Sequence, residues 1–274
     1  MGFQTGRRLL LLSPLLVFGQ DGGDAIWRKF LTWLDGIPAS DNPANLIAEF
    51  QAVLQRDGAS AVELNNARGA ILSRMKSQVD GWQRIFNKIY ASKTPGFSTK
   101  PNALLVSAVE DTKPGRALDV GMGQGRNSVF LAIRGWDVTG FDVSDEGLAV
   151  ARRNAEAAGV KLQALMTSNE AFDFGEGRWD LIVITYEPFP LTDKSYVARL
   201  ARALRPGGRV VIESFASNAD GVGRKPVDID PRGLLQAFQQ GFQIRRFEDV
   251  MAVPDWDPAK TRVVRMVAEK DGTR

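Results

Sequence analysis

Three glycines at alternate positions, Gly121, Gly123 and Gly125, follow a short apolar run and precede a segment with helical spacing of apolar residues. Such a turn lets a ligand approach the backbone closely, because no Cβ stands in the way. It also directs the unpaired amides of a helix N-terminus at that ligand. Asp119 stands two residues before the first glycine, and a carboxylate there suits a ligand with a positive group better than a pyrophosphate.

The spacing around the glycines narrows the kind of ligand. A dinucleotide fingerprint, G-x-G-x-x-G, requires glycine at the position that Arg126 occupies. Asp142 ends the next apolar run and lies 142 − 121 = 21 residues after Gly121. An acidic residue about 20 residues downstream, at the tip of the second strand, holds the hydroxyls of a ribose. The predicted ligand has a ribose, a positive group and no pyrophosphate.

The elements that must position these residues alternate between strands and helices. The expected strands are residues 116–120, 136–141, 161–166, 179–185, 209–214, 242–249 and 262–268. The expected helices between them are residues 127–134, 145–158, 194–204 and 231–239. This alternation predicts an α/β protein with a Rossmann-like, doubly wound, seven-stranded sheet that is mostly parallel. The link before the last strand is short, so that strand is expected to run antiparallel.

A small helical region, residues 21–81, is expected before a larger domain that comprises residues 82–274. The region is interpreted as a packing appendage, with a substrate lid or an interaction module as the alternative. Trp82, Phe86 and Tyr90 are four residues apart on one helix face, a stripe more typical of a core than of a substrate site.

Residues 1–20 resemble a secretory signal, with Arg7 and Arg8 before a short apolar run. That run is shorter than the about 20 apolar residues that span a bilayer. Membrane association through residues 7–18 is therefore the alternative interpretation.

Residues 117–128 (ALDVGMGQGRNS) resemble motif I of the class I S-adenosylmethionine-dependent methyltransferases. Residues 179–185 and 204–208 resemble that family's fourth strand and the turn before its fifth. Residues 88–105 resemble the cofactor-covering segment of small-molecule members, including the tellurite-resistance type. The resemblance covers roughly residues 82–270 and implies S-adenosylmethionine as the cofactor.

The resemblance also assigns cofactor contacts. Gly121 and Gly123 would approach the methionine part, Asp142 would take the ribose, and Val143 would pack on the adenine. Asp119 would orient the loop or the cofactor's ammonium group. The family often has an acid after its third strand, where this chain has Ser168 and Asn169, with Glu170 as a shifted substitute. The other expected cofactor contacts are Phe97, Gly125, Asn127 and Thr185.

In the family, the loop after the fourth strand faces the methyl group and the acceptor. Here that loop offers Tyr186 and Glu187 as the candidates for orienting or deprotonating a nucleophile, although both could be ordinary loop residues. The sequence Tyr-Glu-Pro-Phe differs from the D/N-P-P-Y/F motif of the enzymes that methylate DNA amino groups. This difference argues against a DNA base as the acceptor.

Composition sets further limits. The chain of 274 residues has no cysteine and no histidine, which excludes a thiolate nucleophile, a Cys/His zinc site and a triad with histidine; no metal site is expected. Its net charge of +3, from 35 basic and 32 acidic residues, argues against a nucleic-acid partner.

Taken together, these features predict methyl transfer to a small-molecule acceptor. The alternatives are a protein methyltransferase and an exported relative that binds the cofactor without transferring a methyl group. The chemistry favours a cytoplasmic location, whereas the N-terminal segment favours a secreted or membrane-associated one.

Overall fold

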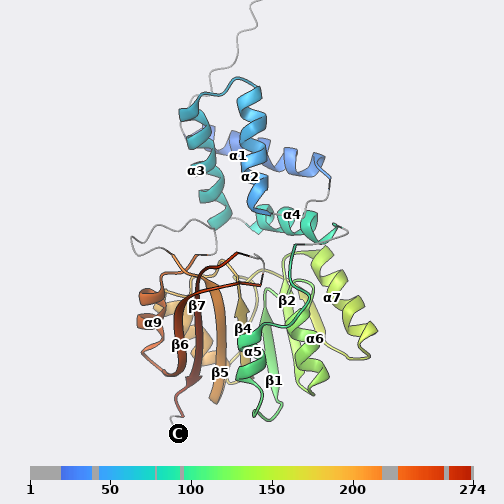
Figure 1. The fold of residues 1–274 in the computed structure, drawn as a ribbon, viewed down its shortest axis with the longest axis vertical. Helices are drawn as coiled ribbons and strands as arrows, with labels where there is room; N and C mark the ends of the chain where they lie inside the picture. The colour runs from blue at the N-terminus through green and yellow to red at the C-terminus, as the bar shows by residue number, and fades with distance from the viewer. Residues whose placement is uncertain are drawn as a thin grey trace, which may run out of the picture.

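The computed structural model describes residues 20–38, 43–77, 79–92, 96–217, 228–255 and 259–272. The predicted signal-like segment lies outside these residues, apart from Gln20. Figure 1 shows a group of helices stacked on an α/β domain, with one helix of the group lying along the junction.

The α/β domain is built on one seven-stranded sheet in the order β3-β2-β1-β4-β5-β7-β6. Strands β1 to β5 pair in parallel, and β7 runs antiparallel to both of its neighbours. The strands are β1 Arg116–Val120, β2 Asp137–Asp142, β3 Gln163–Met166, β4 Trp179–Thr185, β5 Leu204–Phe215, β6 Phe242–Ala252 and β7 Thr261–Lys270. The prediction of a doubly wound, mostly parallel sheet is confirmed. Two bounds differ most, because β5 already begins at Leu204 and β6 continues to Ala252.

Helices flank this sheet, and all of them except α6 begin at a side-chain cap. They are α5 Ala103–Ala108, α6 Arg126–Ile133, α7 Asp145–Ala157, α8 Lys194–Ala203 and α9 Pro231–Phe238. The Ser144 hydroxyl accepts a hydrogen bond from the Gly147 amide and caps α7. Asp230 caps α9 ahead of a proline in its first turn. The caps at Ser144 and Asp230 therefore determine where α7 and α9 begin, and these starts lie beside the carboxyl ends of β2 and β5.

The first helices of the described chain, ahead of α5, form a core of their own. They are α1 Gln20–Gly36, α2 Pro43–Arg56, α3 Ala61–Ser77 and α4 Val79–Tyr90. Phe30, Phe50 and Ile71 are fully buried between them. Among the described residues, no helix is long and apolar enough to cross a membrane.

Helix α4 joins this helical cap (α1–α4) to the sheet. It contributes Ile85 and Ile89 to the core of the cap. The Lys88 ammonium group donates a 2.6 Å hydrogen bond to the Ile37 carbonyl, just after α1. The predicted division after residue 81 falls inside α4, which Figure 1 shows lying above the carboxyl ends of the strands.

Candidate functional site

The three glycines adopt left-handed backbone conformations, with φ of 68° at Gly121, 49° at Gly123 and 76° at Gly125. A methyl group at the first would collide with the Glu187 carboxyl group, and one at the second with the Tyr90 hydroxyl. One at the third would lie 2.9 Å from the Ala151 methyl group in α7. Gly121 and Gly123 therefore keep the floor of a cavity open, whereas Gly125 permits helix packing.

Asp142 ends β2 beside this loop, as predicted. Its Oδ2 accepts a 2.8 Å hydrogen bond from the Gly123 amide, and its Oδ1 accepts one of 2.8 Å from the Ser144 amide. Burial raises the pKa of Asp142 although both amides oppose this shift. The carboxylate is thus fixed against the glycine loop and keeps lone pairs for further donors.

Asp119 lies on β1 beneath the loop and is 2% exposed. It accepts a 2.6 Å hydrogen bond from the Ser128 hydroxyl in α6. Burial raises the pKa of Asp119 to about 6, against the opposing effect of Ser128. The residue is placed to hold the loop on its helix, and it lies behind the described cavity wall rather than in it.

The shifted pKa of Asp119 predicts a pH-dependent stability. The unfolded chain titrates near ~3.9, so the folded state holds the proton more tightly. This group then lowers the free energy of unfolding by at most about 3 kcal/mol as pH rises from about 4 to above 6. Asp119→Asn keeps an acceptor for Ser128. We expect the variant to exceed the natural chain in urea unfolding by about 1 kcal/mol at pH 4.5 and by about 3 kcal/mol at pH 7.5. An equal difference at both pH values would contradict the assignment, and Asp137→Asn on the exposed end of β2 is the control.

A cavity opens above the loop, between the carboxyl ends of β1, β2 and β4 and helix α4. Its described lining residues are Phe86, Tyr90, Phe97, Gly121, Met122, Gly123, Gln124, Arg126, Asn127, Asp142, Thr185 and Glu187. The structure thus brings together the predicted contacts Phe97, Asn127 and Thr185 with the glycines and Asp142. Asn127 and Thr185 also meet directly, since the amide of Asn127 donates a 3.2 Å hydrogen bond to the threonine hydroxyl.

Glu187, one of the two catalytic candidates, lies over Gly121 in this cavity. Enclosure by the cavity walls, together with repulsion from Asp142 and Asp119, holds the pKa of Glu187 well above its usual range. A nearby cation would reverse this shift, because it favours the charged carboxylate.

Tyr186, the other candidate, is buried and is not among the described residues that line the cavity. Its hydroxyl donates a 2.6 Å hydrogen bond to Glu213 Oε1, and Arg265 donates one of 2.7 Å to Glu213 Oε2. Tyr186 also has a φ of 60°, a strained value for a residue other than glycine. The hydrogen bond from Tyr186 to Glu213 holds this turn of the chain in place. That turn directs the next side chain, Glu187, at the glycine loop.

Besides Asp119 and Gly125, three more predicted contacts lie outside the described lining of the cavity. Asn169 is buried and accepts a 2.6 Å hydrogen bond from the Tyr196 hydroxyl. The Ser168 hydroxyl accepts a 3.3 Å bond from the Ala171 amide in its own turn. Val143 packs against the core of the helical cap. These side chains have structural partners within the protein, and their predicted cofactor contacts stay predictions.

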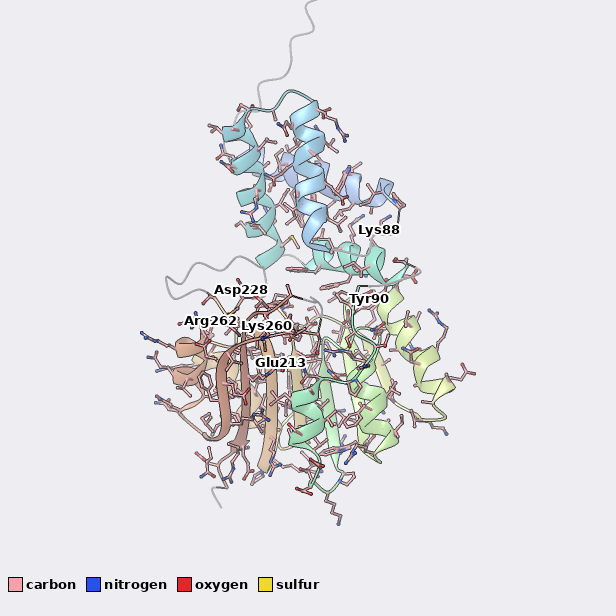
Figure 2. All side chains as sticks on the ribbon, in the orientation of Figure 1. Lys88, Tyr90, Glu213, Asp228, Lys260 and Arg262 are labelled. Atoms are coloured by element: carbon pink, nitrogen blue, oxygen red, sulfur yellow. The ribbon has the colours of Figure 1, made fainter. Side chains whose placement is uncertain are left out.

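Two lining residues come from the aromatic stripe on α4, which was interpreted as core. Trp82 does serve the cap, since its indole donates a 2.7 Å hydrogen bond to the Met75 carbonyl. Tyr90 instead lies at the junction with the sheet (Figure 2), with its hydroxyl over Gly123 and its ring against Gly147. Phe86 and Phe97 pack around it, with ring centroids 6.4 and 5.2 Å from that of Tyr90. The four-residue spacing indicates that these side chains share one face of α4. It does not indicate that this face begins in the core of the helical cap and ends at the cavity.

Comparisons with known proteins agree with this geometry. A family model described as a methyltransferase domain matches residues 117–208. The demethylmenaquinone methyltransferase of Thermus thermophilus is 35% identical over 105 residues, which are 37% of this chain and 48% of that protein. Ribosomal RNA small subunit methyltransferase C of Alcanivorax borkumensis is 31% identical over 153 residues, which are 52% of this chain and 44% of that protein.

The third relative is TehB of Haemophilus influenzae, a probable S-adenosyl-L-methionine-dependent methyltransferase. It is 32% identical over 101 residues, which are 35% of each chain. Its crystal structure superposes with a TM-score of 0.54 at 20% identity, over 70% of this chain and 67% of that one. The chain therefore spans less than half of the length of each of these three curated relatives.

Residues 117–208 belong to the methyltransferase domain family, and the fold that contains them is that of the class I S-adenosylmethionine-dependent methyltransferases. The cofactor of this family is S-adenosylmethionine. The site fits that cofactor, because two glycines form a floor that a Cβ would fill and Asp142 offers an anchored carboxylate.

Proposed function

We propose that this protein transfers a methyl group from S-adenosylmethionine to a small aromatic acceptor that carries a hydroxyl group. The observation that carries the proposal is the meeting of Gly121, Asp142 and Glu187 at one cavity. Each comes from the carboxyl end of a different strand, where ligands bind in such sheets.

The aromatic walls support the acceptor class. Phe86, Tyr90 and Phe97 enclose the cavity with ring faces and edges, which favour stacking with a planar ring. The relative from Thermus thermophilus is named for a quinone-like acceptor, demethylmenaquinone. The near-balanced charge of the chain supports a small molecule over the ribosomal RNA for which the Alcanivorax relative is named.

The protein contributes to the reaction by positioning the two reactants and by surrounding them with charged and polar groups. The cofactor supplies an electrophilic methyl group and a sulfur leaving group. Holding the acceptor in line with that methyl group can lower the activation free energy by about 7–11 kcal/mol. Asp142 would hold the ribose hydroxyls, and the backbone at Gly121 and Gly123 would receive the methionine part. Glu187 would accept the proton that the acceptor hydroxyl loses.

The test is turnover by the full chain. S-adenosylhomocysteine formation is measured with a panel of phenols and quinols, amines, thiols and ribosomal RNA. We expect turnover with phenols or quinols, and a decrease of about 100-fold in Glu187→Gln, within the usual contribution of a general base. Cofactor affinity should change much less than turnover in this variant.

Glu176→Gln is the matched control, because the Glu176 side chain is 80% exposed. Turnover only with ribosomal RNA would contradict the acceptor class. Tight cofactor binding without turnover on any member of the panel would favour the non-catalytic alternative.

A further inference from the structure

Arg126 is the only cationic side chain among the described residues that line the cavity. It is the first residue of α6, directly after the glycine loop, and its side chain is 10% exposed. One guanidinium nitrogen lies 2.6 Å from Asp255 Oδ2, and the other donates a 2.9 Å hydrogen bond to the Lys100 carbonyl. Sequence patterns alone assign Arg126 no ligand contact, since they indicate only that it excludes the dinucleotide fingerprint and opens a helix.

Asp255 reaches this position from the connection between β6 and β7. Its Oδ2 also accepts a 2.9 Å hydrogen bond from the Asn102 amide group. The Asp255 side chain is 19% exposed, so solvent reaches it. If Arg126 moved away, Asp255 would keep one protein donor and could gain water. The ion pair is therefore exchangeable at low cost, in contrast to a fully buried pair.

The charges around the cavity are unevenly distributed. Asp142 and Glu187 face the cavity, and Asp119 lies beneath its floor. The cofactor of this family carries an ammonium and a sulfonium group, which suit that acidic side. It also carries one carboxylate, for which the described lining offers a single cation, Arg126. The amides at the start of α6 add a partial positive charge at the same place.

We propose that Arg126 binds the carboxylate of the cofactor's methionine part and that Asp255 occupies Arg126 until that carboxylate displaces it. This inference rests on the proposed function, since it assumes that S-adenosylmethionine is the ligand. A guanidinium group suits this role because it binds a carboxylate through two parallel hydrogen bonds. Cofactor binding would then release the β6–β7 connection from its contact with α6.

The test compares two ligands by calorimetry on the full chain. S-adenosylhomocysteine carries the carboxylate, and 5′-deoxy-5′-methylthioadenosine keeps the adenosine and the thioether but lacks the amino-acid group. We expect Arg126→Met to weaken S-adenosylhomocysteine binding about 10- to 100-fold, the value of a hydrogen bond to a charged group. Binding of methylthioadenosine should change less than about twofold, within normal context effects for a contact that this ligand does not make.

Two further variants sharpen the comparison. Arg126→Lys keeps the positive charge but lacks the planar guanidinium group. Its affinity for S-adenosylhomocysteine should therefore lie between those of the natural chain and of Arg126→Met. Asp255→Asn keeps a partner for Asn102 but removes the competing carboxylate, and it should strengthen S-adenosylhomocysteine binding. Arg134→Met, at the exposed far end of α6, is the matched control and should change neither affinity.

Each contrary outcome has a separate meaning. An equal loss for both ligands in Arg126→Met would give Arg126 a structural role and overturn the inference. Unchanged affinity for both would also overturn it, since the carboxylate would then bind elsewhere. If the natural chain bound neither ligand, the proposed function itself would fail. A thermal unfolding curve for each variant excludes misfolding as the cause, and Arg126→Lys carries the test if Arg126→Met does not fold.

Discussion

Replacing Asp142 with alanine is expected to weaken S-adenosylhomocysteine binding by about 100-fold or more, since each hydrogen bond to a charged group is worth about 1.5–3 kcal/mol. The carboxylate is predicted to accept both ribose hydroxyls. It also accepts the amides of Gly123 and Ser144, and so holds the glycine loop in place. The substitution removes the ligand contact and leaves two amides without their partner. Isothermal calorimetry on the full chain measures the effect.

Asp137→Ala is the control for this experiment. Asp137 begins the same strand that Asp142 ends, but it is exposed and its contact with Arg116 is a long one of 3.8 Å. Its replacement should leave the affinity unchanged. Asp142→Asn, which keeps a side-chain oxygen for one amide, separates loss of the ribose contact from loss of loop structure. Full affinity in both Asp142 variants would exclude the ribose assignment.

The second large effect is expected at Gly123. Alanine there must adopt a φ of 49° and place its methyl group against the Tyr90 hydroxyl, in the cavity itself. We expect Gly123→Ala to weaken cofactor binding by about 100-fold or more, because a backbone cradle that needs glycine tolerates no Cβ. The stability cost should exceed the about 1–2 kcal/mol of a residue other than glycine in the left-handed region, because the methyl group also collides with the Tyr90 hydroxyl.

Gly177→Ala separates the two effects. Gly177 has a similar φ of 51°, but a methyl group there would meet open space. Gly177→Ala should lose only the about 1–2 kcal/mol of backbone strain in urea unfolding, Gly123→Ala should lose more, and only Gly123→Ala should lose the cofactor. Equal affinity in the two variants would show that the cavity above Gly123 is not the binding site.

The sheet and the loop were predictable because their signals are local. Asp119, the three glycines and Asp142 lie within 24 residues, and each signal depends on chain geometry that nearby residues determine. Strand order followed from the alternation of strands and helices. The bounds of β5 were less predictable, since the turn-forming residues Pro206 and Gly207 lie within the paired strand.

Side chains that meet across long sequence separations were not predictable in this way. Tyr186 reaches Glu213, and Asn169 reaches Tyr196, each across 27 residues. Periodicity identified strands β4 and β5 and helix α8, but not which polar side chains at or near them would form hydrogen bonds. Tyr90 lies on the apolar face of α4, and no pattern within that helix shows that a second domain lies beneath its last turn.

The position of Tyr90 has a consequence for how fast ligands exchange. Its hydroxyl lies over Gly123, but its helix is fixed by Ile85 and Ile89 in the core of the cap. Clearing the cavity therefore requires movement of a packed helix rather than rotation of one side chain. Packed elements move on a timescale of about microseconds to milliseconds, whereas side chains rotate within about nanoseconds. The residence time of the spent cofactor is thus linked to the stability of the N-terminal helices, and ligand release rather than methyl transfer is expected to limit the turnover rate.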